Sequence, residues 1–164
     1  MRPGDARAFL EVHHSSVRAL AAKDYPPETV EAWAPMPITP EAVASVLENA
    51  EDEIRLIAER GGEAVGIGAL IAARSHLRAC YVAPQAARSG VGTMLLAEIE
   101  RIARAEGVEA LALNSSIMAE AFYRACGYAS LGRAEHIMRD GRPMTCVRMT
   151  KRISSPPPTG EDRR

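Results

Sequence analysis

Residues 81–96 read YVAPQAARSGVGTMLL and join a predicted strand to a predicted helix, Gly90–Ala105. The first N–H groups of a helix have no intrahelical acceptor, and the helix dipole gives that end a partial positive charge. Gly90 and Gly92 carry no side chains, so an anion can approach this backbone closely. Arg88 adds a side-chain donor for a phosphate. The stretch therefore predicts a pyrophosphate cradle between a strand and a helix.

The same turn lacks the features of two common nucleotide-binding motifs. A P-loop requires Gly-Lys-Ser or Gly-Lys-Thr, which this sequence does not contain. A dinucleotide fingerprint requires a third glycine, where this sequence has Leu95, and a first strand upstream, where helices are predicted. A nucleotide-binding protein of another fold is therefore disfavoured. Packing of the helix against the strand stays open as the alternative role of the glycines.

A second motif follows a short apolar strand, Leu111–Leu113. Residues 116–128 read SIMAEAFYRACGY and predict a helix over Met118–Ala125. Ser116 can cap this helix or bind a ligand. The hydroxyl of Tyr123 could reach a cleft in the neighbouring sheet, and a core aromatic is the alternative role of this side chain.

The other elements lie on both sides of these motifs and are read from hydrophobic periodicity and turn residues. They are helices Ala6–Ala22, Glu28–Trp33 and Glu41–Asn49, and strands Ile54–Glu59, Ala64–Ala72, His76–Val82, Tyr128–Leu131, His136–Arg139 and Thr145–Met149. Asp5 and Thr39 are the expected N-caps, and Gly66 and Gly68 are expected to allow close backbone approach. Helices, antiparallel strands and a strand–helix–strand crossover predict an α/β fold of the α+β type with a mixed sheet.

Composition limits the classes of protein that fit. The chain has 164 residues, 47% hydrophobic and 25% charged, which is typical of one globular domain. We expect this domain over residues 1–153 and a disordered tail, rich in proline and polar residues, over residues 154–164. A net charge of −1 provides no field that would recruit nucleic acid or an anionic membrane, so neither partner is expected.

Segments that would direct the chain to a membrane or hold a metal are also not expected. The sequence has no apolar run of the length, about 18 residues, that a membrane span needs. The first residues lack a signal-peptide core, so we expect a cytoplasmic protein. Cys80, Cys126 and Cys146 form no CxxC pair, which predicts neither a disulfide framework nor a metal site.

Three segments together resemble the GCN5-related N-acetyltransferase (GNAT) superfamily. They are residues 81–84 (YVAP), 90–96 (GVGTMLL) and 119–128 (AEAFYRACGY). The third is similar to the family signature A-x-x-F-Y-x-x-x-G-F, with Tyr128 in place of the phenylalanine. The close match covers residues 76–128, and the predicted order of elements extends it over residues 5–153.

The sequence departs from the family pattern in three places. Ala87 occupies the position where the family carries Gln or Arg, and Arg88 follows one residue later. Ser116 stands where many members carry Asn. The family's first strand normally precedes the region of Arg2–Asp5, so this strand is either missing or lies upstream of Met1.

The resemblance implies a mostly antiparallel central sheet flanked by helices, and acetyl-CoA as cosubstrate without a metal. The cosubstrate would lie in a V-shaped opening between His76–Val82 and Leu111–Leu113. Free backbone groups of Tyr81 and Val82 would pair with the pantetheine, and the N–H near Val82 would polarise the thioester carbonyl. The expected cosubstrate contacts are Tyr81, Val82, Arg88, Ser89, Gly90, Val91, Gly92, Thr93, Ser116, Ala119 and Tyr123.

The resemblance also assigns the proton transfers that accompany attack by an amine. Tyr123 is the expected acid that protonates the departing thiolate. We nominate His76 as the base, because some family members carry a catalytic glutamate at this position. His76 precedes Val82 by an even number of residues, so strand alternation predicts that both face the same side. A pocket-lining histidine, with a water chain as base, is the alternative.

The acceptor is expected to be a primary amine on a small molecule or a peptide. In the family, the helices that carry His13, His14 and Trp33 here close over the acceptor site. Tyr25 and Trp33 are therefore candidate substrate contacts, with a core role as the alternative for Trp33. A non-catalytic acyl-CoA-binding sensor of the same fold is the second functional hypothesis. Both a monomer and a homodimer are compatible with the sequence.

Overall fold

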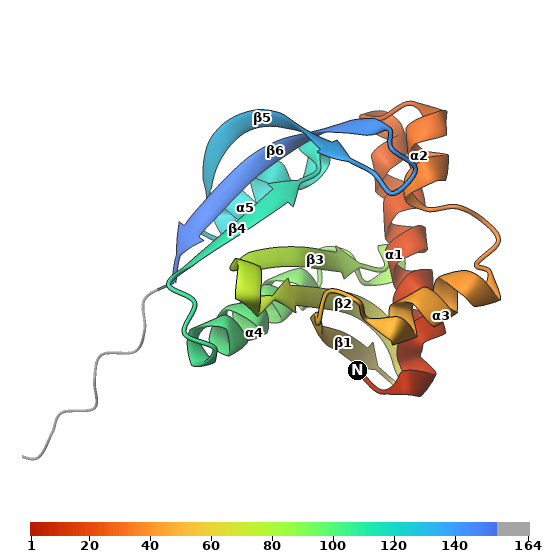
Figure 1. Cartoon of the computed structure of the whole chain (residues 1–164), viewed down its shortest axis with the longest axis horizontal. Helices are drawn as coiled ribbons and strands as arrows, with labels where there is room; N and C mark the ends of the chain where they lie inside the picture. Colours follow the sequence, from red (N-terminus) through yellow and green to blue (C-terminus); the bar gives the residue numbers. More distant parts are fainter. Residues whose placement is uncertain (154–164) are drawn as a thin grey trace, which may run out of the picture.

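The computed structural model describes residues 1–153, so the predicted disordered tail lies outside the described residues. Six strands form one sheet in the order β1-β2-β3-β4-β6-β5, with helices on both faces (Figure 1). The strands are β1 Ile54–Arg60, β2 Glu63–Ile71, β3 His76–Val82, β4 Ala110–Ser115, β5 Ala129–Ile137 and β6 Pro143–Arg152. The helices are α1 Ala6–Leu20, α2 Pro27–Trp33, α3 Pro40–Glu48, α4 Val91–Ala105 and α5 Glu120–Ala125.

Only one neighbouring pair in the sheet, β3 with β4, is parallel, and the other four pairs are antiparallel. This arrangement confirms the predicted mixed, mostly antiparallel sheet. The parallel pair is held at one end alone, where His76 is in register with Ala112 and the Ala112 N–H donates to the Ser75 carbonyl at 2.9 Å. Beyond this point the two strands diverge, which gives the predicted V-shaped opening (Figure 1).

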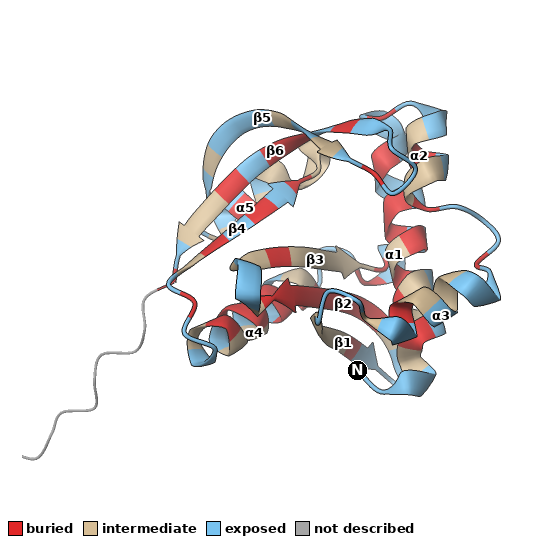
Figure 2. Ribbon diagram, in the orientation of Figure 1, coloured by how far each residue is buried: buried red, intermediate tan, exposed pale blue. Residues whose placement is uncertain are grey.

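Strand β2 is the most deeply buried strand, because α1 packs on one face of it and α4 on the other (Figure 2). Two glycines allow α4 to approach. A Cβ atom at Gly66 would lie 2.7 Å from Val91 Cγ1, and one at Gly68 would lie 2.7 Å from Ile99 Cδ1. Because real Cβ atoms do not come this close to other atoms, the predicted close approach at both glycines is confirmed.

A hydrophobic cluster and an ion pair connect the two halves of the splayed sheet. The cluster joins Leu77 and Ile99 of the first half to Tyr123 and Met149 of the second. Lys151 Nζ on β6 donates to both carboxylate oxygens of Glu100 on α4, at 2.8 and 2.9 Å. These contacts therefore fix the relative position of β3 and β4, which share almost no backbone pairing.

Several local predictions are confirmed and others are wrong. The Thr39 side chain caps α3 by accepting from the Ala42 N–H at 3.2 Å. Asp5 precedes α1 but does not cap it, because its carboxylate accepts the Arg2 N–H at 2.7 Å and closes the short 3-10 turn at Pro3–Asp5 instead. The last sheet segment is one continuous β5 rather than two pieces, with a bulge near Gly132 that preserves pairing with β6.

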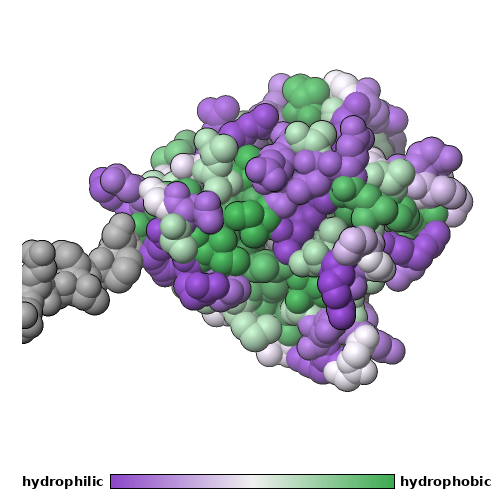
Figure 3. All heavy atoms as spheres, turned by 60° about the horizontal axis from the view of Figure 1, so that its bottom comes forward, coloured by the Kyte–Doolittle hydropathy of each residue, from purple (hydrophilic) through white to green (hydrophobic). Residues whose placement is uncertain are grey.

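Strand β1 is the edge of the sheet, and within residues 1–153 no strand precedes α1. The Met1 amino group donates to the Arg55 carbonyl at 3.1 Å, so the start of the chain lies against this edge. None of the helices in residues 1–153 has both the length and the apolar character needed to cross a bilayer. On the face shown in Figure 3, hydrophilic residues surround smaller apolar patches.

Candidate functional site

The turn before α4 presents a row of backbone N–H groups. Gly90 is the N-cap with φ of 85°, a left-handed conformation that favours glycine, and a Cβ there would meet open space. The first helical N–H to find an acceptor in the chain is that of Met94, which donates to the Gly90 carbonyl at 3.0 Å. The N–H groups of Val91, Gly92 and Thr93 precede it and have no acceptor within residues 1–153, so they can bind an anion.

Gly92 also has the packing role that the sequence left open. A Cβ there would lie 3.3 Å from Phe122 Cζ and 3.4 Å from Val82 Cγ2, so α4, α5 and β3 meet closely at this point. Packing and anion binding are compatible, because the packed side of Gly92 is its α-carbon and its N–H points along the helix axis. The helix start is therefore fixed in place before any ligand binds.

Two arginines lie at the mouth of this turn, and only one of them was predicted. Arg88 lines the cleft and adopts a left-handed backbone conformation with φ of 58°. Arg60, at the end of β1, donates to the Ser89 hydroxyl at 3.0 Å, and that hydroxyl donates to the Ala86 carbonyl at 2.6 Å. Nothing in the sequence beyond its place beside a hairpin turn marks Arg60, because a tertiary contact brings it to Ser89.

A cleft of about 1270 Å³ runs from this turn through the V-shaped opening to the helices α1 and α2. Most of the predicted site residues line it. They are Trp33, His76, Tyr81, Val82, Arg88, Gly90, Gly92, Thr93, Ser116, Ala119 and Tyr123. Ser89 and Val91 are not among its lining residues, and Val91 is buried against Leu95. Their predicted contribution would be made by backbone N–H groups.

Ser116 begins the short turn that leads into α5. It occupies an N-cap position with an extended backbone, yet its side chain makes no capping hydrogen bond. The residue is half-buried and lines the cleft. Of the two roles that the sequence allowed, the placement therefore favours a ligand contact over capping.

Tyr123 is buried at the joint between the two half-sheets and also lines the cleft. Its ring packs edge-on against Phe122 and Tyr128, with centroids 5.1 and 5.6 Å away. Burial, followed by the nearby Cys80 and Tyr81, raises the pKa of the phenol well above its usual value. The hydroxyl therefore stays protonated at neutral pH, which a proton donor requires.

A bulge in β3 changes the face on which His76 lies. Ala69 is in register with Ala79, whereas the next residue, Leu70, is in register with Leu77, so Arg78 is an extra residue on β3. Leu77 and Val82 consequently both pack on the α4 side. The prediction that His76 and Val82 share a face is wrong, because the extra residue inverts strand alternation between them.

His76 nevertheless remains a lining residue of the cleft. Burial lowers its pKa, and the charges of Arg78, His136 and Arg74 lower it further. The imidazole is therefore neutral at pH 7 and able to accept a proton.

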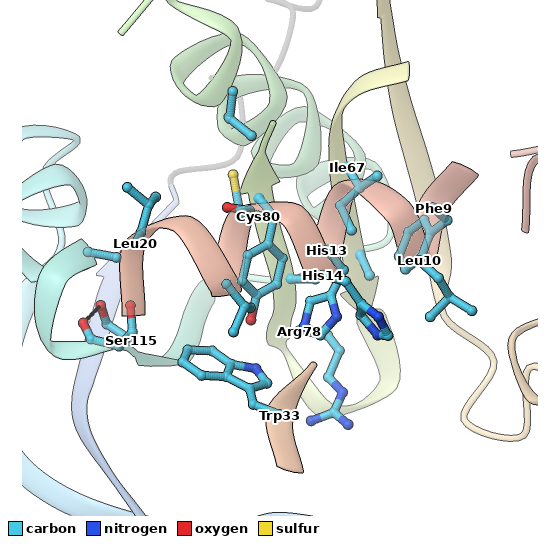
Figure 4. Close-up of a pocket in the computed structure, with 18 of the residues that line it drawn as sticks. Phe9, Leu10, His13, His14, Leu20, Trp33, Ile67, Arg78, Cys80 and Ser115 are labelled. Carbon is cyan, nitrogen blue, oxygen red and sulfur yellow. Dashed lines mark hydrogen bonds between the residues drawn. The ribbon is translucent and has the colours of Figure 1, made fainter. Parts of the chain in front are cut away.

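An aromatic wall closes the far end of the cleft, and Figure 4 shows His13 on α1 and Trp33 at the end of α2 directed into it. The His13 ring packs edge-on against Tyr81 at 4.7 Å, and Trp33 packs against the same ring at 6.4 Å. Trp33 thus lines the cleft as predicted.

Tyr25, the other candidate substrate contact, does not line the cleft. It is buried, and its hydroxyl donates to the Thr145 carbonyl at 2.8 Å and accepts the Ile117 N–H at 3.0 Å. These bonds use the hydroxyl to join the α1–α2 connection to β6 and to the turn after β4. The predicted substrate contact is therefore replaced by a structural role.

Potential metal ligands are dispersed. Among residues 1–153, no three His, Cys, Asp or Glu side chains form a group that could hold a metal ion. The three cysteines are free.

A splayed β3–β4 joint with a glycine turn and helix start beside it defines a class of proteins that bind a phosphate-bearing ligand in the opening. The sequence profile of the acetyltransferase (GNAT) domain matches residues 21–152. The chain therefore belongs to the GNAT acetyltransferase family, as the resemblance implied. Among curated proteins, none matches the sequence significantly.

Solved structures agree with this membership. A GCN5-related N-acetyltransferase from Rhodopseudomonas palustris is 29% identical with a TM-score of 0.83, over 93% of this chain and 92% of that one. A ribosomal-protein-alanine N-acetyltransferase from Brucella melitensis is 25% identical with a TM-score of 0.68, over 93% and 96% of the two chains. PaiA N-acetyltransferase from Thermoplasma acidophilum, solved with coenzyme A, shares the fold at 19% identity and a TM-score of 0.66, over 93% and 95%.

Replacing Tyr25 with Phe tests its structural role. Both the Thr145 carbonyl and the Ile117 N–H lose a partner, so we expect the free energy of unfolding to fall by about 1–3 kcal/mol in urea denaturation. Tyr128→Phe is the matched control, because that hydroxyl is buried without a hydrogen-bond partner in residues 1–153. A Tyr25→Phe protein as stable as the parent would contradict the assignment.

Proposed function

We propose that this protein transfers an acetyl group from acetyl-CoA to a primary amine within a ternary complex. The observation that carries the proposal is the row of free N–H groups at Val91–Thr93, which opens onto the same cleft as the diverging end of β3 and the buried Tyr123. Family membership supports acetyl transfer, and the relative solved with coenzyme A supports the cosubstrate.

The residues around the opening divide the binding of the cosubstrate between them. The N–H groups at the start of α4, with Arg88 and Arg60 beside them, suit a pyrophosphate. The unpaired edge of β3 at Tyr81 and Val82 suits an extended pantetheine, which would add to the sheet like a short strand. The Val82 N–H is then the proposed donor to the thioester carbonyl oxygen.

The proposed reaction makes a C–N bond and breaks a C–S bond. The neutral amine nitrogen attacks the thioester carbonyl carbon, and the sulfur leaves with the bonding electron pair as a thiolate. His76, directly or through water, takes the proton from the amine, and Tyr123 gives a proton to the thiolate. No covalent intermediate on the protein is needed.

A non-catalytic acyl-CoA sensor of the same fold is the competing hypothesis. It would use the same cradle without turnover. The buried Tyr123 and the neutral His76, both lining the cleft, favour an enzyme, because a sensor has no need for a proton donor and acceptor there.

Acetyl-CoA should stabilise the protein against thermal unfolding, whereas ATP and NAD should not. At a concentration near 100 times the dissociation constant, the expected gain is about 2.7 kcal/mol. Arg88→Ala should weaken this binding, because the variant loses a phosphate donor. Arg124→Ala, an exposed arginine outside the cleft, is the control. If no CoA ester raises the melting temperature, both the enzyme and the sensor are excluded.

Tyr123→Phe should lower kcat by about 100-fold or more, because the departing thiolate loses its proton donor. Release of the free CoA thiol at saturating acetyl-CoA measures the rate, so that loss of a Tyr123 contact with the cosubstrate does not enter kcat. A variant that turns over as fast as the parent would leave Tyr123 with only its packing role.

His76→Gln should remove an acid-side ionisation from the pH profile of kcat/KM. Because the His76 pKa is lowered, the parent loses its base only below pH 6.5, the ordinary value, while the imidazole stays competent at neutral pH. We therefore expect the parent-to-variant rate ratio to be large and constant at neutral pH and to fall at acid pH. An unchanged ratio near one at every pH would assign the base to a water chain.

A further inference from the structure

Arginines dominate the acceptor end of the cleft, the part lined by His13, Trp33, Arg78, His136 and Arg139. These residues come from α1, α2, β3, and from β5 and the turn that follows it. Figure 4 shows the Arg78 side chain extending into the cavity below His13 and beside Trp33. The charge balance of this region decides what kind of amine it accepts.

Arg78 is the extra residue of the β3 bulge, and its charge is only partly balanced. Its Nε lies 3.6 Å from Glu53 and 3.9 Å from Glu51. Both carboxylates have closer partners, since Arg55 and Arg74 each contact one of them at 2.6 Å. Three guanidinium groups therefore share two carboxylates, and the Arg78 guanidinium makes no hydrogen bond within residues 1–153.

Arg139 lies in the turn that follows β5 and lines the same cleft as Arg78. The adjacent Asp140 does not neutralise it, because that carboxylate pairs with Arg142 at 2.8 Å and also accepts the Arg142 N–H at 3.1 Å. Within the described part of the chain, Arg139 forms no ion pair. The acceptor end thus carries the partly balanced charge of Arg78 and the charge of Arg139, which has no carboxylate partner within residues 1–153.

Arg78 and Arg139 line the same cavity as three histidines, and the charges of both arginines act on His13. Burial, the neighbouring His14 and the charges of Arg139 and Arg78 lower the pKa of His13 to about 3. Burial and then Arg78 also lower the pKa values of His76 and His136. Within residues 1–153, the carboxylates that line the cleft are those of Glu53 and Asp140, and both are engaged in ion pairs. The acceptor end is therefore positive in the absence of substrate.

We propose that the acceptor is a small primary amine that also carries an oxyanion, such as the carboxylate of a free amino acid, held between Arg78 and Arg139. Guanidinium groups bind carboxylates and related oxyanions through paired, charge-assisted hydrogen bonds. The same charges repel amines that carry no anionic group, so the pocket selects by repulsion as well as attraction. The proposal rests on the proposed acetyl transfer and names the class of its acceptor.

Matched pairs of acceptors test this proposal through release of the CoA thiol. Glycine, L-alanine, L-leucine and L-phenylalanine are compared with their α-amides, and putrescine serves as an amine without an anionic group. The amine of an amide is less basic and more of it is neutral, so chemical reactivity alone favours the amides. We expect at least a tenfold higher kcat/KM for one or more of the acids. Aminomethylphosphonate distinguishes a pocket for carboxylates from one that also takes phosphonates.

Arg78→Gln and Arg139→Gln should each reduce the acid-to-amide ratio about tenfold or more, mainly through KM. Arg78→Lys keeps the charge and should retain part of the preference. Arg124→Gln is the control, because this exposed arginine pairs with Glu120 on α5 and does not line the cleft. The melting shift with acetyl-CoA should be unchanged in every variant, which shows that the fold and the cosubstrate site are intact.

Two outcomes overturn the acceptor class and leave acetyl transfer standing. In the first, the parent has a higher kcat/KM for the amides or putrescine than for the acids. In the second, neither arginine substitution changes the ratio of kcat/KM for acid and amide. If no amine releases CoA although acetyl-CoA stabilises the protein, the proposed acetyl transfer fails instead. Stabilisation of the CoA-bound protein by the amino acid, lost in Arg78→Gln, then tests the anion site without turnover. If none of the acids stabilises the CoA-bound protein, the proposed anion site is also excluded.

Discussion

The whole structure depends on the single point at which the backbones of two half-sheets pair. Strands β3 and β4 are in register only at His76 and Ala112, so the backbone edge of β3 beyond that point has no strand beside it. Backbone polar groups without partners are costly when they are buried away from water. An opening of this kind is stable only if it stays accessible to water or to a ligand that can pair with the edge. The cleft, and with it the binding function, follows from this one interruption of the sheet.

The interruption in turn requires other interactions to hold the halves at a fixed angle. Glycines at positions 66 and 68 bring α4 against β2, and the Glu100–Lys151 ion pair joins α4 to the far half of the sheet. Tyr25 provides a further link, from the N-terminal helices to β6 and the turn after β4. Because rigid elements support both walls, the cradle and the aromatic end of the cleft keep a fixed separation.

Local sequence signals were sufficient for the parts of the site that one segment builds. The glycine turn, the start of α4 and the helix with Tyr123 all depend on residues within a few positions of one another. The predictions about the site that were wrong or missing depended on strand register and on tertiary contacts. The bulge at Arg78 has no signature in the sequence, so alternation placed His76 on the wrong face. Arg60 reaches Ser89, and Tyr25 reaches Thr145, only through tertiary contacts. Neither contact can be inferred from periodicity.

The extra residue in β3 has a wider consequence for how such a protein can change. The bulge divides β3 into two segments, and side-chain alternation in one segment does not continue into the other. After the bulge, the backbone edge at Tyr81 and Val82 suits a ligand that the family shares. At and before the bulge, His76 and Arg78 line the part of the cleft that is proposed to bind the acceptor. If the proposed acceptor site is correct, substitutions at His76 and Arg78 can therefore alter which amine is bound without disturbing the backbone edge beside the glycine turn. One strand thus combines a half whose backbone suits the proposed cosubstrate with a half whose side chains line the proposed acceptor end.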